Sequence, residues 1–384
     1  MTAALVTFGW LCGALACAGA VYSLIAALLV RRFFCSKAVV TTEFPAVTIL
    51  KPLKGDEPGL RAHLESFCRQ DYPGEVQFIF GVQDPNDPAI RCIEALRRDL
   101  PDHDIQLVVD AREYGANRKV SNLVNIMREA RHDILVLADS DIGVQPSYLR
   151  NIVAALSAPG TGLVTCLYRG ESVRGLCAEL SAIAIDYHFL PSVIFGLAVG
   201  LARPCVGATI ALRRSVLEQI GGFDAFANHL ADDNAIGEAV RNRGFGVAVP
   251  PMTVVHACTE QRFGDLISHE LRWARTIRAV DQMGFAGSII THPLPIAFAG
   301  VVASGFSLAA TGVLLFTLIC RVVLLRQVDR SLGVHGRHWW LWPVRDFLSL
   351  IIFTAAFFVN SVTWRGRRLR VDPYGILSSS VKGH

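Results

Sequence analysis

The chain has 384 residues, 52% of them apolar, and a formal net charge of +4 at pH 7. This length and apolar content allow a large core with membrane spans, and the modest charge, part of which flanks apolar segments, argues against nucleic acid as a partner. The ten cysteines are scattered without a Cys-x-x-Cys pair. Their spacing argues against both a zinc site and a disulfide framework, and fits a reduced cytosolic domain.

The N-terminus predicts a membrane anchor over residues 1–32. Residues 4–30 carry no charge and are followed by Arg31 and Arg32. A span across a ~30 Å hydrocarbon layer takes about 20 residues, and a cleaved signal peptide has a basic start that is missing here. The positive flank places the following domain on the cytoplasmic side.

Two further apolar zones follow a mixed region, residues 45–283, which has the composition of a globular domain. Residues 285–325 are interrupted by two prolines, Pro293 and Pro295, and residues 347–364 end at a basic tail, 365–384. We expect a C-terminal membrane region over 285–364 with two or three spans and a broken or re-entrant start. The side on which the C-terminus lies stays open.

Strands alternate with helices of about ten residues in the first half of the globular region. The expected strands are 47–50, 76–82, 105–109 and 134–138, with helices from Leu60, from Ala89 and over 122–130 between them. This order predicts an α/β fold with a mostly parallel sheet flanked by helices. No G-x-G-x-x-G follows the first strand, which excludes a dinucleotide fingerprint.

The second half of the globular region is less regular. Strands are expected at 162–167 and 206–212. Between them, residues 189–202 are apolar but too few to cross a bilayer. They are interpreted either as a buried helix or as a segment that touches lipid.

Asp139-Ser140-Asp141 follows the apolar run 134–138 directly. An apolar run that ends in two acids is typical of a buried parallel strand with carboxylates at its C-terminal tip, where open α/β sheets bind ligands. Two such carboxylates can hold one divalent cation together with substrate phosphates. The alternative is a polar turn that caps the next helix.

Six segments in order resemble the motifs of one family. They are Lys51–Gly55, Val82–Pro88, Asn117–Asn122, Ala138–Asp141, Ala231–Asp233 and His269–Trp273. Together they are similar to the ceramide-glucosyltransferase family of inverting membrane glycosyltransferases. The resemblance implies a GT-A nucleotide-sugar-binding domain between N-terminal and C-terminal transmembrane helices. It also implies a UDP-sugar donor and a lipid acceptor held in the bilayer.

Within that family, Cys68–Pro73 and His269–Arg278 resemble the bacterial hopanoid-biosynthesis glycosyltransferases. That resemblance implies transfer of N-acetylglucosamine from its UDP donor to a hopanoid such as bacteriohopanetetrol. It also implies an integral protein of the bacterial inner membrane with its catalytic domain on the cytoplasmic face. The alternatives are a ceramide glucosyltransferase that uses UDP-glucose, a processive polysaccharide synthase, and a catalytically silent membrane scaffold.

The resemblance assigns the family's catalytic roles to aspartates of this chain. Asp233 matches the general base that deprotonates the acceptor hydroxyl in an inverting transfer. Asp141, with Asp139 beside it, would hold Mg²⁺ or Mn²⁺, which stabilises the leaving diphosphate. The alternative for Asp232 and Asp233 is that both acids simply complement the dipole of a helix N-terminus.

Donor binding is expected at Asp84, Lys119, Asp139 and Lys51. Asp84 would accept a hydrogen bond from the uracil imide, and the alternative is a proline-rich turn with no ligand. Lys119 would reach a phosphate or the base, and the alternative is a solvated lysine at a helix start.

The last motif supplies the pyrophosphate and acceptor side. Arg272 would grip phosphate oxygens in bidentate fashion. Trp273 would stack on the acceptor or line the product site, with a core aromatic as the alternative. His269 stands where the family commonly has Gln or Arg, and it can still hydrogen-bond a phosphate or a hydroxyl.

Overall fold

The computed structural model describes residues 3–334, 338–358, 362–364, 367–371 and 377–379. The chain forms two compact units, and neither is continuous in sequence. Unit 1 comprises Met1–Ser36, Arg169–Arg203 and Cys258–Asn360, and unit 2 comprises Lys37–Tyr168, Pro204–Ala257 and the C-terminal strands. Parts of the expected 45–283 domain therefore group with the apolar helices. The expected basic tail, 365–384, lies largely outside the described residues.

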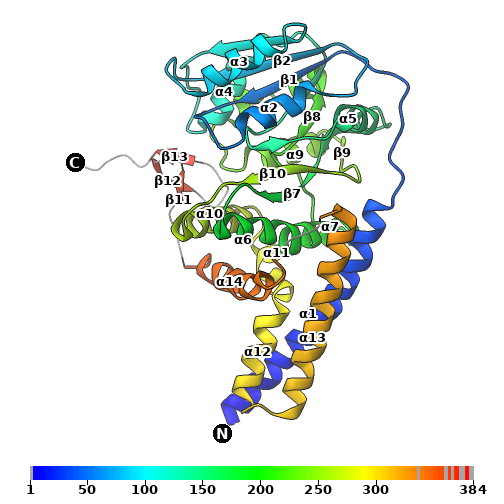
Figure 1. Cartoon of the computed structure of the whole chain (residues 1–384), viewed down its shortest axis with the longest axis vertical. Helices are drawn as coiled ribbons and strands as arrows, with labels where there is room; N and C mark the ends of the chain where they lie inside the picture. Colours follow the sequence, from blue (N-terminus) through cyan, green and yellow to red (C-terminus); the bar gives the residue numbers. More distant parts are fainter. Residues whose placement is uncertain (1–2, 335–337, 359–361, 365–366, 372–376, 380–384) are drawn as a thin grey trace, which may run out of the picture. The chain divides into compact units, whose positions relative to one another are not determined.

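A mixed seven-stranded sheet forms the centre of unit 2, in the order β3-β2-β1-β4-β8-β6-β9 (Figure 1). The strands are β1 Val47–Pro52, β2 Val76–Val82, β3 Asp104–Val109, β4 Ile134–Leu137, β6 Thr161–Thr165, β8 Ile210–Arg213 and β9 Gly246–Ala248. Only β8 runs antiparallel to its neighbours. The carboxyl ends of β1, β2 and β4 therefore share one edge of the sheet.

Both faces of the sheet are buried under helices, which explains the continuous apolar runs of its strands. Ile49 and Val136 pack into one core with α2 Leu60–Cys68, α3 Ala89–Asp99 and α5 Tyr148–Leu156. Leu50 and Leu137 point to the opposite core, as the period of two requires. That second core contains α4 Arg118–Met127, α8 Arg214–Gln219, α9 Asp232–Asn242 and the 3₁₀ turn η2 Phe223–Phe226.

Two smaller sheets complete the described strands. β5 Ile142–Gly143 pairs antiparallel with β10 Thr253–Cys258, and β7 Leu167–Ser172 follows in the same sheet. β11 Val362–Trp364, β12 Arg367–Val371 and β13 Leu377–Ser379 form an antiparallel sheet near the C-terminus.

The expected strands before the D-x-D segment are confirmed to within two residues. The strand expected at 162–167 is instead two strands, β6 and β7, which are separated at Cys166. The strand expected at 206–212 begins only at Ile210, because Val206 accepts a hydrogen bond from the Thr209 amide (3.2 Å) in a turn. Helix α4 begins at Arg118, four residues earlier than expected.

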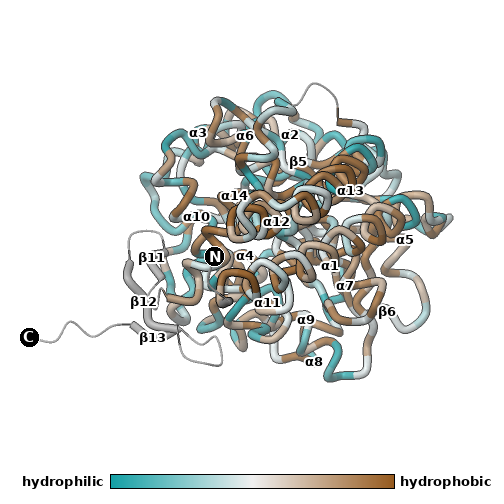
Figure 2. Tube along the Cα trace, turned by 90° about the horizontal axis from the view of Figure 1, so that it is seen from below, coloured by the Kyte–Doolittle hydropathy of each residue, from teal (hydrophilic) through white to brown (hydrophobic). Residues whose placement is uncertain are grey.

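Unit 1 is mainly helical, and it also includes most of β7 and the last residue of β10. Its elements are α1 Ala3–Phe34, α6 Leu176–Ala184, the π-helix η1 Ile185–Phe189, α7 Leu190–Ala198, α10 Phe263–Val280, α11 Gln282–Gly287, η3 Ser288–Thr291, α12 Pro293–Ala303, α13 Leu308–Leu332 and α14 Leu341–Ala355. Helix α1 packs along α12 and α13 (Figure 1). Seen from below, α12, α13 and α14 carry mainly hydrophobic residues (Figure 2).

Three helical segments of the described chain are long and apolar enough to cross a membrane: Ala4–Phe34, Leu176–Ala198 and Leu308–Leu332. A fourth candidate is the pair Gln282–Thr291 and Pro293–Ala303, which is bent by 65° and confirms the expected break at the prolines. Helix α14 has 15 residues, about 22 Å, which is short of a ~30 Å layer.

The expectation that residues 189–202 are too few to cross a bilayer is corrected. Helix α7 continues backward through η1 and α6 to Leu176, which gives a helical segment of 23 residues. Asp186 and His188 interrupt the apolar pattern in sequence, and the side chain of Asp186 is buried on the amide of Gly170 (2.7 Å). Because of these two polar residues, the sequence analysis underestimated the length of this helical segment.

Candidate functional site

The D-x-D segment lies at the carboxyl end of β4 in unit 2. The Ala138 amide donates to Leu50 O (3.4 Å) and the Asp139 amide to Gly207 O (3.3 Å). The chain then enters β5, and α5 begins only at Tyr148. Asp139 and Asp141 therefore do not cap a helix, and the edge position predicted from the sequence is confirmed.

Lys119 connects this turn to the start of α9. Its Nζ lies 2.7 Å from Asp139 Oδ1 and 3.4 Å from Asp232 Oδ2, and its side chain is only 13% exposed. Burial alone would lower the pKa of Lys119, but the carboxylates of Asp139 and Asp232 raise it above the ordinary value. Lys119 is thus a paired cation within the site, and the alternative of a solvated lysine is wrong.

Helix α4 positions Lys119 through its N-cap. The side chain of Asn117 accepts from the Val120 amide (3.2 Å) and donates to Asp232 Oδ1 (3.2 Å). The same side chain therefore caps α4 and holds the acid that faces Lys119. Asp232, which the sequence analysis named only in the helix-dipole alternative, is part of the charged cluster.

Asp233 lies in the first turn of α9, and its two oxygens have different partners. Oδ2 accepts from the Gly207 amide (2.9 Å) and Oδ1 from the Asn234 amide (2.8 Å). Burial and the neighbouring Asp232 raise the pKa of Asp233 to about 6. A carboxylate with such a pKa can accept a proton near neutral pH. Asp233 therefore lies both at the N-terminus of a helix and within the candidate site.

Gly207 is a site residue that sequence reasoning missed. A Cβ atom at this position would lie 2.8 Å from Asp139 Oδ2 and 3.0 Å from Lys119 Nζ. Its amide and carbonyl also contact Asp233 and Asp139. The sequence signal was a glycine three residues before β8, and it did not distinguish a close approach from a turn.

Asp139 and Asp141 fit a divalent cation. Asp141 Oδ1 is buried and has no hydrogen-bond partner among the described residues, and Oδ2 lies 3.5 Å from His256 Nδ1. Burial raises the pKa of Asp139, and the nearby Asp141 carboxylate adds to this, so a bound cation would relieve the repulsion. No group of three or more acidic, His or Cys ligands occurs among the described residues, and Mg²⁺ is usually held by one or two carboxylates together with water and substrate phosphates. His256 gave no sequence signal.

Lys51 and Asp84 lie outside direct contact with this cluster. The side chain of Lys51 is fully buried, with Nζ 3.4 Å from Ile142 O and 3.7 Å from the centre of the Phe67 ring. Burial lowers its pKa to about 7. Asp84 is exposed just after β2, and its side chain accepts a hydrogen bond from the Asn86 amide (2.9 Å). Asp84 therefore stabilises the proline-rich turn that was the alternative to uracil binding.

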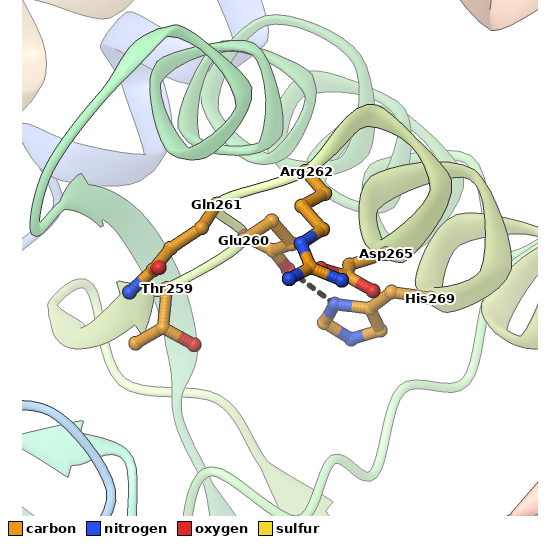
Figure 3. Close-up of a pocket in the computed structure, with 6 residues that line it drawn as sticks. All are labelled: Thr259, Glu260, Gln261, Arg262, Asp265 and His269. Atoms are coloured by element: carbon orange, nitrogen blue, oxygen red, sulfur yellow. Dashed lines mark hydrogen bonds and ion pairs between the residues drawn. The ribbon is translucent and has the colours of Figure 1, made fainter.

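The last predicted residues lie on α10, in unit 1. The rings of His269 and Trp273 meet edge to face with centroids 4.6 Å apart. Arg272 and Trp273 are both half-buried. The sequence did not predict the partner of His269, which is Glu260, and both residues line a polar pocket (Figure 3).

Comparisons with known proteins identify relatives of this chain. Ceramide glucosyltransferase 1 of Caenorhabditis elegans is 22% identical over 348 residues, covering 88% of this chain and 74% of the relative. The ceramide glucosyltransferase of Candida albicans is 36% identical over 125 residues, 30% of this chain and 23% of the relative.

A solved mannosyltransferase from Pyrobaculum calidifontis, in complex with GDP-mannose and Mn²⁺, is similar in fold. It has a TM-score of 0.53 and 20% identity, covering 92% of this chain and 98% of that one. The GT-A type of glycosyltransferase fold, with apolar helices that could span a membrane, is therefore confirmed. The sequence model of Glycosyl transferase family 21 matches residues 11–377. This chain belongs to glycosyl transferase family 21.

Proposed function

We propose that the chain is a membrane-bound inverting glycosyltransferase that moves a sugar from a UDP donor to a hydroxyl of a lipid acceptor. One observation carries the proposal: β4, α4 and α9 bring Asp139, Lys119, Asp232 and Asp233 together at the ligand edge of the sheet. The relatives named ceramide glucosyltransferase support a lipid acceptor. The helices long enough to span a membrane support an acceptor that stays in the bilayer.

Each residue of the cluster has a chemical task in this proposal. Asp233 takes the proton of the acceptor hydroxyl while the oxygen attacks the anomeric carbon. Asp139 and Asp141 would hold Mg²⁺ or Mn²⁺, which supplies positive charge to the leaving diphosphate. Lys119 keeps Asp139 in place, because its Nζ bridges Asp139 and Asp232. Asp84 and Lys51 remain proposed donor-side residues, and His269, Arg272 and Trp273 remain proposed pyrophosphate and acceptor residues.

For the substrates we propose N-acetylglucosamine as the sugar and a hopanoid such as bacteriohopanetetrol as the acceptor, in a bacterial inner membrane with the catalytic site on the cytoplasmic face. The resemblance of Cys68–Pro73 and His269–Arg278 supports this choice. The second candidate is glucosyl transfer to ceramide, which the names of the relatives favour.

The test uses the full chain in phosphatidylcholine nanodiscs with Mg²⁺ or Mn²⁺. UDP-N-acetylglucosamine and UDP-glucose are each offered with bacteriohopanetetrol or ceramide, and lipid products are identified by mass spectrometry. We expect one sugar on bacteriohopanetetrol and a loss of about 10³-fold or more in Asp233→Asn. Asp224→Asn, an exposed acid in η2, is the matched control and keeps its rate.

Each other outcome removes a named part of the proposal. Equal rates in the wild type and Asp233→Asn would remove the base assignment. A product from ceramide alone would establish the second candidate, and a polymeric product would establish a processive synthase. No transfer from any UDP-sugar would leave the silent scaffold.

A further inference from the structure

The residue between the two acids of the D-x-D segment has a partner of its own. Ser140 is 7% exposed, and its Oγ donates a hydrogen bond of 2.6 Å to Glu57 Oε2. Glu57 lies in the loop between β1 and α2, 83 residues earlier in the chain. The length of this bond is typical of an O–H donor on an ionised carboxylate, which makes a bond about twice as strong as a neutral one. Glu57 belongs to none of the six sequence motifs and has no task in the mechanism described above.

The backbone of this loop is held on both sides of Glu57. The Gly55 amide donates to both carboxylate oxygens of Asp87 (2.9 and 3.1 Å), and the Leu60 amide donates to Glu57 O (2.9 Å). Asp87 also accepts from the Ala89 amide (2.9 Å) at the start of α3. The carboxylate of Glu57 therefore projects from a fixed backbone, which allows it to fix the group that it binds.

The rest of the D-x-D segment is held by other parts of unit 2. Lys51 Nζ lies 3.4 Å from Ile142 O, directly after the second acid. The backbone oxygen of Asp141 accepts from the Ala257 amide (3.0 Å) at the end of β10. Each residue from Ser140 to Ile142 is thus connected to a distant segment, and Ser140 is connected through its side chain.

These contacts support a carboxylate that is ready to bind a ligand. Asp141 Oδ1 is buried and has no hydrogen-bond partner among the described residues. A carboxylate binds a metal ion well only when neighbouring interactions hold it in the ligating direction, and loss of such an interaction typically weakens metal binding about 10–100-fold. Ser140 lies between Asp139 and Asp141 in the chain, so a movement of the backbone at Ser140 would displace both acids.

We propose that Glu57 is a positioning residue for the cation site: its hydrogen bond to Ser140 holds the D-x-D segment in the conformation in which Asp139 and Asp141 bind one divalent cation. The inference rests on the proposed function, which assigns a cation to these two aspartates. Glu57 acts through Ser140 and not as a further ligand, since the described residues contain no group of three or more side chains that could hold a metal ion.

The first experiment measures binding of Mn²⁺ alone to the full chain in phosphatidylcholine nanodiscs by isothermal titration. Glu57→Met and Glu57→Gln both remove the charge, but only Gln keeps an oxygen that can accept from Ser140. We expect the Kd for Mn²⁺ to rise tenfold or more in Glu57→Met and clearly less in Glu57→Gln. Asp56→Asn, an exposed acid of the same loop, is the matched control and should stay within twofold of the wild type.

A double-mutant cycle tests whether Glu57 acts through Ser140. Ser140→Ala alone should weaken Mn²⁺ binding about as much as Glu57→Met. In the Ser140→Ala background, Glu57→Met should add less than twofold, because the hydrogen bond is already lost. An effect of the Glu57 charge on the cation would instead persist in that background.

Sugar transfer at different Mn²⁺ concentrations separates positioning from damage to the fold. In Glu57→Met, the Mn²⁺ concentration for half-maximal transfer should rise tenfold or more. At saturating Mn²⁺, the rate should return to within threefold of the wild type, and the KM for the UDP-sugar should stay within twofold. A loss that saturating Mn²⁺ does not restore would show a general defect and overturn the inference.

The binding results can also overturn it. They do so if Glu57→Met binds Mn²⁺ as the wild type does, if Glu57→Met and Glu57→Gln lose equal affinity, or if the two changes of the cycle are fully additive. Failure of the proposed function has a different outcome: the wild type binds Mn²⁺ and moves no sugar, while the binding measurements still decide the role of Glu57.

Discussion

The two units differ in how they neutralise buried acidic side chains. In unit 2, the carboxylates of Asp139, Asp232 and Asp233 gather around the ammonium of Lys119, with Asp141 next along the turn. In unit 1, two buried acids, Asp346 and Glu270, each face their own guanidinium. Arg321 donates to both oxygens of Asp346 (2.9 and 2.7 Å), and Arg345 to both oxygens of Glu270.

We interpret the acid-rich cluster of unit 2 as a binding site and the acid–arginine pairs of unit 1 as structural supports. A one-to-one bidentate pair satisfies its own charge and holds helices together, here α13 with α14 and α10 with α14. An excess of carboxylates stores repulsion that a cation or a proton relieves. The raised pKa of Asp233 and the buried, unbonded Oδ1 of Asp141 are the visible signs of that excess.

The largest expected effect comes from breaking a pair in unit 1. Asp346→Asn leaves Arg321 buried without its counter-charge, which costs about 3–5 kcal/mol. We expect a large drop in the apparent melting temperature in detergent. The double variant Arg321→Met with Asp346→Leu should recover most of the loss. If Asp346→Asn melts like the wild type, the supporting role of this pair is wrong.

Removing an acid from unit 2 should have the reverse effect on folding. Asp141→Asn takes one charge out of an acid-rich cluster, so the melting temperature should stay equal or rise, while sugar transfer falls by about 10²–10³-fold. Isothermal titration with Mn²⁺ should show weaker binding. Asp102→Asn, an exposed acid, serves as the control. A strong loss of folding in Asp141→Asn would contradict the contrast between the two units.

The excess of carboxylates also predicts a pH dependence. Because the pKa of Asp233 is about 6 and only its carboxylate form accepts a proton, kcat/KM should fall roughly tenfold for each pH unit below about 6. The folded state holds this proton more tightly than the unfolded state, in which the pKa is near 3.8. The contribution of Asp233 to stability therefore decreases as pH rises from about 4 to about 6. A flat rate profile between pH 5 and 7 would exclude Asp233 as the group that titrates.

The smallest effect is expected at Lys51. Burial lowers its pKa from 10.5 to about 7, so the unfolded state binds more protons between these values and wild-type stability rises with pH across that window. Lys51→Met should remove this slope and raise stability at pH 7 by about 1 kcal/mol. Thermal melts from pH 6 to 9 measure both quantities. Lower stability of Lys51→Met at every pH would show that the contacts to Ile142 and Phe67 outweigh the burial cost.

Sequence reasoning worked best where a pattern is local. The four strands before Asp139 follow from apolar runs buried on both faces, and their carboxyl ends follow from the polar residues that end each run. It worked less well where a turn interrupts an apolar run. Cys166 is apolar and does not mark the end of a strand, and Gly207 in the turn over Val206–Thr209 did not show by itself that β8 begins only at Ile210.

The candidate site was predicted in part. Asp139, Asp141, Lys119 and Asp233 stand in recognisable segments, and the structure brings them to one edge of the sheet. Gly207 and His256 were missed, since a close approach and a cross-strand neighbour arise only when β8 and β10 are in place. Glu260 was missed because its partner His269 lies nine residues away on a helix that the sequence interpreted through its own motif.

By itself the sequence determined the chemistry available to this protein: an acid-rich turn after a buried strand, a second pair of acids, and apolar stretches long enough for a membrane. Those features depend on residue type and spacing along the chain, which folding does not change. Only the tertiary structure decided which charges meet. It paired Lys119 with Asp139 and Asp232, and it closed Asp346 and Glu270 against arginines, because contacts between distant segments depend on packing that no local pattern records.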